Sequence, residues 1–460
     1  MTTTEHDGIL AELGGFVSAT TCKRLPEPIV HKAKACLLYG LAVGIASVRA
    51  PQPQQAAQAL DGELSSGSGA ATRLFDQRQV DFHSAAFCNA VLSHSRVQDD
   101  SHPCGHFGVV AIPAALSCAE RFDAAGSEML AALVAGYEVA LRIGRDHAAD
   151  LTARGFRTTP VYGVFAAAAC AARIFKLGPD ACARALALAT SAAGGLREWI
   201  DAGTEELPFQ AGLAARNGLL CASLAAAGAA AALSSLTGGA GFFRAFGSDS
   251  DRYARRVCEK LGEEFELETI TYKPYPISQF LRGVVRGTID LRARAAGREP
   301  RAIAIHMHPF EADFIGNRYA GPFSSFSQAL TSAPFCTALA WTSGNVTFAG
   351  LHEFTNQAIL SMVGRIAIVS DSSRARYSPR LVVTFDDKKT LEWQETEGAD
   401  AYRLTWDVAV EMNAKLCAEA GVSVGKSEAL RVAAAAMDRA INVRNLVAAA
   451  ADCAAEARRG

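Results

Sequence analysis

The sequence predicts a mainly α-helical protein that combines a large all-helical domain with a smaller α+β lid domain. Residues 1–265 are rich in alanine and leucine at helical spacing, which predicts the helical domain. Short β-branched segments with strand-like alternation mark residues 266–400 and predict the lid domain. The helical pattern returns in residues 401–460. We expect this tail to pack back onto the first domain, so that the lid domain is an insertion.

The hydrophobic periodicity also places the individual elements. Helices of the first domain are predicted at Glu27–Ser47, Glu128–Arg145, Tyr162–Phe175, Ala181–Ala193 and Gly212–Ala227. Strands of the lid domain are predicted at Glu266–Tyr272, Ala302–His308, Ile366–Val369, Arg380–Phe385 and Thr390–Glu395, and the last two form a hairpin. The remaining helices are expected at Ser278–Arg294, Ser325–Thr342, Thr355–Val363, Val408–Ala420, Ser427–Asp438 and Val443–Ala457.

The overall composition is typical of a soluble globular protein. Half of the 460 residues are apolar, 20% are charged and the net charge is -2, so nothing indicates a nucleic-acid partner. The twelve cysteines form no CxxC pair, which predicts buried free thiols in a reducing cytoplasm. The polar segment Met1–Gly8 does not resemble a signal peptide. The most apolar stretch, Gly218–Leu236, contains serines and glycines and is expected to be a buried core helix rather than a membrane span.

The densest polar cluster lies between two apolar segments, at His94–His106. Its three histidines and two aspartates are typical of residues that line a cleft, and a solvated loop with capping carboxylates is the alternative. A metal site is not favoured, because a proline and a glycine interrupt any helix between His102 and His106. We expect Asp99 and Asp100 to orient histidines or to cap a helix rather than to abstract protons.

A second cluster, Tyr272–Pro276, holds Lys273 beside two prolines and directly after a predicted strand. A lysine held in this way loses its charge readily when desolvated and can act as a base, and an exposed turn is the alternative. Guanidinium groups bind carboxylates through two parallel hydrogen bonds. Candidates for this role are Arg142, Arg157, Arg197 and Arg282, of which Arg142 has a structural partner in Glu138. The chain has no GxSxG motif and no strand–GxGxxG–helix unit, so a serine hydrolase and a Rossmann fold have no support.

Taken together and in order, these segments resemble the MmgE/PrpD family. The similarity runs through Asn89–His106, Gly136–Gly144, Arg154–Phe156, Gly163–Ala172, Gly212–Gly218, Gly239–Phe243 and Lys273–Pro276. The resemblance implies a large helical domain with a smaller α+β lid, in agreement with the pattern described above. It also implies a homodimer whose chemistry needs neither a cofactor nor a metal.

The chain departs from the family pattern at several acid–base positions. Val97 stands where the family usually has aspartate, Arg157 where it has histidine, and Leu207 or a neighbour where it has lysine. Ser278 and Arg282 replace a cysteine and a histidine. A dehydratase must also protonate a leaving hydroxyl group, whereas an epimerase needs only one base on each face of a planar carbanion. These losses, together with two histidines replaced by arginines that can bind carboxylates, favour epimerisation of a carboxylate-rich substrate. Iminodisuccinate fits, and the resemblance to family members that epimerise it implies an isomerase that abstracts and returns the α-proton.

The expected residue roles follow from this two-base mechanism on a small polycarboxylate. The expected catalytic residues are Lys273 as one base and His106 as the other, with His102 as its rival. The expected substrate-binding residues are Arg157, Arg282, Arg96, Tyr319 and Asp99. Two alternatives stay open. One is a hydro-lyase of the 2-methylcitrate dehydratase or cis-aconitate decarboxylase type that acts on a tricarboxylate, and the other is a non-catalytic protein that binds organic acids. We expect no nucleic-acid partner and no membrane partner.

Overall fold

The computed structural model describes residues 8–61 and 70–459, and its helices and strands fall into two units. The first unit comprises the described parts of residues 1–196, 207–270 and 404–460, and the second comprises residues 197–206 and 271–403. The first unit is almost entirely helical, whereas the second combines helices with a four-stranded sheet. The predicted fold class, mainly α with a smaller α+β region, is therefore confirmed.

The first unit contains the eight helices predicted for it and further helices that the sequence pattern did not predict. Its helices are α1 (Ile9–Ala19), α2 (Glu27–Ala46), α3 (Pro51–Leu60), α4 (Phe82–His94), α5 (Gly108–Arg121), α6 (Gly126–Gly144), α7 (Ala148–Ala153), α8 (Thr158–Ile174), α9 (Pro179–Ala192), α11 (Leu207–Ala226), α12 (Phe242–Phe246), α13 (Ser250–Ala254), α19 (Trp406–Glu419), α20 (Val424–Ala435) and α21 (Arg444–Arg459). A short antiparallel hairpin, β1 (Ala70–Arg73) and β2 (Arg78–Asp81), precedes α4. The sequence pattern did not predict this hairpin.

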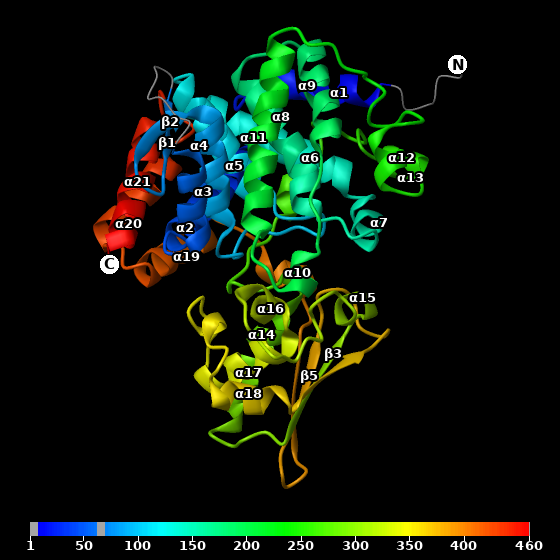
Figure 1. The fold of residues 1–460 in the computed structure, drawn as a ribbon, viewed down its shortest axis with the longest axis vertical. Coiled ribbons are helices and arrows are strands. Elements are labelled where there is room, and N and C mark those ends of the chain that lie inside the picture. Colours follow the sequence, from blue (N-terminus) through cyan, green and yellow to red (C-terminus); the bar gives the residue numbers. More distant parts are fainter. Residues whose placement is uncertain (1–7, 62–69, 460) are drawn as a thin grey trace. The chain divides into compact units, whose positions relative to one another are not determined.

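Helix α8 lies at the centre of the first unit and packs against α5, α6, α9 and α11 (Figure 1). Its residues 159–174 are all buried, so apolar side chains surround the helix on every side. Small residues let its neighbours approach closely. A Cβ atom on Gly218 of α11 would lie 2.5 Å from the carbonyl oxygen of Val164, and one on Gly136 of α6 would lie 2.8 Å from that of Ala166. The alanine- and glycine-rich sequence therefore builds a closely packed helical core.

Helix α2 also belongs to this core. It is the one helix of the described residues that is long and apolar enough to cross a membrane, and 78% of its apolar window is buried inside the protein. The core helix of a globular unit has the same length and composition. All twelve cysteines are free thiols and ten of them are buried, which agrees with the predicted absence of disulfide bonds.

The prediction that Gly218–Leu236 forms one buried helix is wrong. Helix α11 ends at Ala226, and the turns that follow, up to residue 241, are largely exposed. Gly228 adopts a φ angle of 88°, a left-handed conformation that glycine reaches without a steric penalty. Such a residue ends a helix, although alanines stand on both sides of Gly228 and continue the apolar pattern past it.

The prediction of a strand at Glu266–Tyr272 is also wrong, because these residues begin with a 3₁₀ turn at Glu266–Thr269. Some of their backbone groups are bonded to side chains of the helical core, and an isolated bridge pairs Thr271 with Arg403. The Leu267 N–H group donates to Glu138 at 2.9 Å, and the Ile270 carbonyl accepts from Lys32 at 2.5 Å.

The second unit is built on a sheet with the strand order β4–β3–β5–β6. Its elements are α10 (Trp199–Ala202), α14 (Arg282–Ala295), β3 (Ala302–Met307), α15 (Pro309–Ala312), α16 (Phe326–Thr331), α17 (Ala333–Ser343), α18 (Gln357–Val363), β4 (Ile366–Ser370), β5 (Arg380–Thr384) and β6 (Thr390–Gln394). Strand β3 pairs parallel with β4 and antiparallel with β5, which forms the predicted hairpin with β6. Helices α14 and α17 pack against each other and against these strands (Figure 1).

One predicted helix of the second unit, Ser325–Thr342, is divided into α16 and α17. The break lies at Ser332, whose hydroxyl group accepts the Phe335 N–H group at 3.0 Å. Pro334 follows in the first turn of α17, where its missing N–H group costs nothing. A capping serine with a proline two residues later therefore starts a new helix, although the apolar pattern continues without a break.

Candidate functional site

The polar cluster predicted from the sequence forms the loop between α4 and α5 in the first unit, and it is buried. Asp99 and Asp100 are almost fully buried, as is His102. The alternative of a solvated loop is therefore wrong. Among residues 8–61 and 70–459, no three histidine, cysteine, aspartate or glutamate side chains form a group that could hold a metal ion.

The two adjacent aspartates anchor this loop to different helices. Asp99 Oδ1 lies 3.0 Å from Nδ1 of His94 at the end of α4. The Asp100 carboxylate accepts the N–H group of Gly108, at the start of α5, at 3.1 Å and the hydroxyl group of Tyr137 from α6. This arrangement agrees with the expectation that the aspartates orient histidines and cap a helix. The contribution of Tyr137 carries no signal in the sequence.

His106 is held in one tautomer by the same loop. Its Nδ1 atom lies 2.7 Å from the carbonyl oxygen of Asp100, which can only accept a hydrogen bond. The proton is therefore on Nδ1, and in the neutral ring Nε2 carries the lone pair. The N–H group of His106 donates to the hydroxyl group of Thr159 at 3.2 Å. These contacts orient an imidazole that can accept a proton at Nε2.

His102 has the opposite arrangement. Its Nδ1 atom accepts the Cys104 N–H group at 3.1 Å, so the neutral ring carries its proton on Nε2. Burial lowers the pKa of His102 from 6.5 to about 4, because the charged imidazolium loses its hydration. His102 is therefore neutral near pH 7 and is suited to donate a hydrogen bond. Of the two rival histidines, His106 is the better candidate for a base.

The arginines expected to bind substrate in the first unit have partners within that unit. Arg157 lies at the start of α8, donates to the Leu207 carbonyl at 3.0 Å and contacts His94 Nε2. Arg96 forms an ion pair with Glu419 at 2.6 Å. The structure thus places Asp99 and Arg157 in one buried network with His94, whose ring centroid is 6.3 Å from that of His106. Arg96 contacts Glu419 and Gln98.

The other predicted residues lie in the second unit. Lys273 is fully buried, and Arg282 is almost fully buried. The Nη1 group of Arg282 donates to the Thr271 hydroxyl at 2.8 Å and to the Tyr272 carbonyl at 2.9 Å, directly before Lys273. Tyr319 lies elsewhere in this unit and donates its hydroxyl group to a neighbouring backbone carbonyl. The catalytic and binding roles of all these residues remain predictions.

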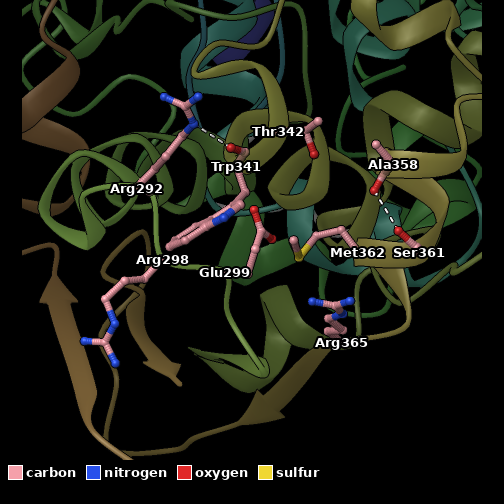
Figure 2. A pocket seen from close by; sticks show the side chains of 10 residues that line it. Arg292, Arg298, Glu299, Trp341, Thr342, Ala358, Ser361, Met362 and Arg365 are labelled. Atoms are coloured by element: carbon pink, nitrogen blue, oxygen red, sulfur yellow. Dashed lines mark hydrogen bonds between the residues drawn. The ribbon is translucent and has the colours of Figure 1, made fainter. Parts of the chain in front are cut away.

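Two surface pockets of the second unit contain neither Lys273 nor Arg282. One pocket of about 310 Å³ contains three arginines and Glu299 (Figure 2). Arg292 turns to the Trp341 carbonyl at 2.6 Å, while Arg298 points away to Asp387 at 2.7 Å. Arg365 points in a third direction, so no common anion-binding centre forms. A second pocket, of about 450 Å³, includes Tyr319 and three charged residues, Asp201, Asp313 and Arg318.

Comparison with known proteins provides further findings. The family model described as MmgE/PrpD N-terminal domain matches residues 11–253. The cis-aconitate decarboxylase-like protein oryM of Aspergillus oryzae is 32% identical over 232 residues, or 48% of each chain. The cis-aconitate decarboxylase of Aspergillus terreus is 27% identical over 310 residues, which cover 64% of this chain and 62% of that protein. The human cis-aconitate decarboxylase is 34% identical over 151 residues, or 31% of each chain.

The matched regions span about a third to three fifths of the length of these curated relatives. Their names describe decarboxylases, which are lyases, so the expected isomerase class is wrong. No relative supports the expected epimerisation of iminodisuccinate. The sequence argument failed because the loss of an acid–base group, such as the one replaced by Val97, does not show which bond of the substrate breaks.

Proposed function

Because the chain belongs to the MmgE/PrpD family, we propose that it is a lyase of the cis-aconitate decarboxylase type that acts on a small polycarboxylic acid. The observation that carries this proposal is the run of relatives with that name, which match up to 64% of the chain. The buried loop with an oriented His106 provides the proton-transfer group that such a reaction needs.

The proposed reaction requires one proton donor. In cis-aconitate, the bond between a CH₂ carbon and its carboxylate breaks, and CO₂ leaves. The electron pair of the broken bond forms a new double bond between the CH₂ carbon and the central carbon. The pair of the original double bond moves to the far alkene carbon. A proton then adds to the far alkene carbon, so that a tricarboxylate and one proton become a dicarboxylate and CO₂. An enzyme lowers the barrier by placing an acid at that carbon and by stabilising the developing negative charge.

His106 is suited to this step in both of its charge states. The backbone carbonyl of Asp100 accepts its Nδ1–H group whether or not Nε2 is protonated. The ring therefore keeps its orientation while Nε2 gives up a proton and regains it. Lys273, which is fully buried, is the proposed second acid–base group.

Incubation of the purified protein with cis-aconitate in deuterium oxide tests the proposal. Proton NMR should show a dicarboxylate that contains one deuteron at the protonated carbon, together with CO₂. The variants His106→Gln and Lys273→Met should each reduce kcat by about 100-fold or more, the size of a general acid–base contribution. The matched control His31→Gln alters a largely exposed histidine and should leave kcat unchanged.

Two results would contradict the decarboxylase proposal. If a hydroxy-tricarboxylate loses water and gives an ultraviolet-absorbing alkene, while cis-aconitate stays intact, the protein is a hydro-lyase. If calorimetry detects tight binding of these acids without any turnover, the protein is a non-catalytic organic-acid-binding protein.

A further inference from the structure

A chain of three buried residues, Asp99, His94 and Arg157, runs behind the loop that carries His106. Asp99 and His94 are fully buried, and Arg157 is nearly so. Asp99 Oδ1 lies 3.0 Å from His94 Nδ1, and Arg157 Nη2 meets His94 Nε2 on the opposite side of the ring. The imidazole is therefore placed between a carboxylate and a guanidinium group.

The partners of His94 determine its charge and its tautomer. A guanidinium group has only donors and cannot be deprotonated in a protein. Nε2 of His94 must therefore accept a hydrogen bond from Arg157, which leaves the single ring proton on Nδ1. That proton is donated to Asp99, which accepts it as a carboxylate. His94 is consequently neutral and lies between a negative and a positive charge.

The same chain connects four separate segments of the first unit. His94 ends α4, and Asp99 lies in the loop that follows it. Arg157 begins α8, donates to the carbonyl of Leu207 at the start of α11, and is bonded through its own N–H group to the Gly195 carbonyl at 3.0 Å. Asp99 directly precedes Asp100, whose carbonyl oxygen holds His106. A change at Arg157 can thus reach His106 through three hydrogen bonds and one peptide unit.

We propose that His94 is an uncharged bridge and that Asp99, His94 and Arg157 are positioning residues for His106. The bridge lets Asp99 neutralise Arg157 without a second positive imidazole 6.3 Å from the ring of His106. Such a charge would disfavour protonation of His106. This inference rests on the acid–base role proposed for His106, but the state of His94 can be measured without any substrate.

Nitrogen-15 NMR of histidine-labelled protein tests the bridge directly. The His94 ring should show a protonated Nδ1 and an unprotonated Nε2, with shifts that do not change between pH 6 and 8.5. Assignment of the signal comes from the His94→Gln variant, in which it disappears. A His94 signal with both nitrogens protonated, or one that titrates in this range, would overturn the proposal whether or not the protein turns over cis-aconitate.

Two variants of His94 separate a bridge from a catalytic group. Glutamine has an amide donor for Asp99 and a carbonyl acceptor for Arg157, so His94→Gln should keep kcat within about fivefold of the wild type. His94→Leu has neither group and should lower kcat at least 50-fold, with a smaller change in KM. If His94→Gln is as inactive as His94→Leu although its fold is intact, His94 takes part in proton transfer and the bridge is excluded.

Arg157→Met tests the other end of the chain. The lone pair of His94 Nε2 is then no longer bound to a guanidinium group, and His94 can gain a proton. The rate of Arg157→Met should therefore fall with decreasing pH through an ionisation that the wild type lacks. Arg154→Met removes a nearby exposed arginine that donates to the Gly247 carbonyl and should keep the wild-type pH profile. An unchanged profile for Arg157→Met would contradict the proposal.

Discussion

Acid should destabilise this protein well above the range in which carboxylates are protonated, because two buried histidines resist protonation. Burial lowers the pKa of His102 from 6.5 to about 4, and it lowers that of His147 in the same way. The unfolded chain therefore binds these protons more readily than the folded one. The stability that results is fully present above pH 6.5 and is lost as the pH falls toward 4.

The size of this effect follows from the shift of His102. With a pKa of 6.5 in the unfolded chain and about 4 in the folded one, this residue alone lowers the free energy of unfolding by about 2 kcal/mol between pH 7 and pH 5. The hydrogen bond that Nδ1 of His102 accepts from the Cys104 N–H group acts in the same direction, because protonation of Nδ1 abolishes the acceptor.

Urea denaturation of the wild type and of His102→Asn at pH 7 and pH 5 measures this contribution. Asparagine can accept the Cys104 N–H group through its side-chain oxygen but does not titrate, so the variant should lose about 2 kcal/mol less than the wild type between the two pH values. His31→Asn, at a largely exposed position, should behave like the wild type. If His102→Asn keeps the full pH dependence, burial of this histidine does not cause it.

Three further variants test the packing and the buried charges of the first unit. Gly218→Ala should lower the free energy of unfolding by about 1–3 kcal/mol, because its methyl group meets the backbone of α8, whereas Gly15→Ala in the open face of α1 should be neutral or stabilising by up to about 1 kcal/mol. Arg142→Met should lower the free energy of unfolding, measured by urea denaturation, by about 3–5 kcal/mol. The substitution removes the guanidinium group whose Nε atom lies 2.9 Å from Oε2 of the buried Glu138. Tyr137→Phe removes one donor from a buried carboxylate and should cost about 1–3 kcal/mol and lower kcat, as measured by denaturation and steady-state kinetics.

The helices could be predicted from the sequence because a buried helix repeats its apolar positions over many residues. Helix α2 begins at the predicted residue, Glu27, and α8 and α11 lie within a few residues of their predicted bounds. The hairpin β1–β2 was missed because each of its strands has only four residues, which is too short for a periodic signal. Gln77 at its turn adopts a φ angle of 63°. Glutamine rarely adopts a positive φ angle, so its presence does not indicate a turn.

The position of the candidate site could be predicted from the sequence, but the roles of its individual histidines could not. A dense group of histidines and aspartates between two apolar helices indicates a buried polar loop, and the structure has such a loop there. The sequence could not show that His102 accepts from a backbone N–H group whereas His106 donates to a backbone carbonyl. These opposite bonds decide which ring nitrogen holds the proton, and they depend on the path of a loop in which Val97 has a φ angle of 55°.

The arginines illustrate a more general limit of reading function from residue types. An arginine at position 157 in place of a histidine suggested an additional group for binding carboxylates. A guanidinium group is always charged, however, and its burial near α8 requires a compensating carboxylate. Asp99 provides that charge through His94, so Arg157 already has a partner within the first unit without any substrate. The number of arginines near a site therefore measures its capacity for carboxylates only after their partners inside the protein have been subtracted.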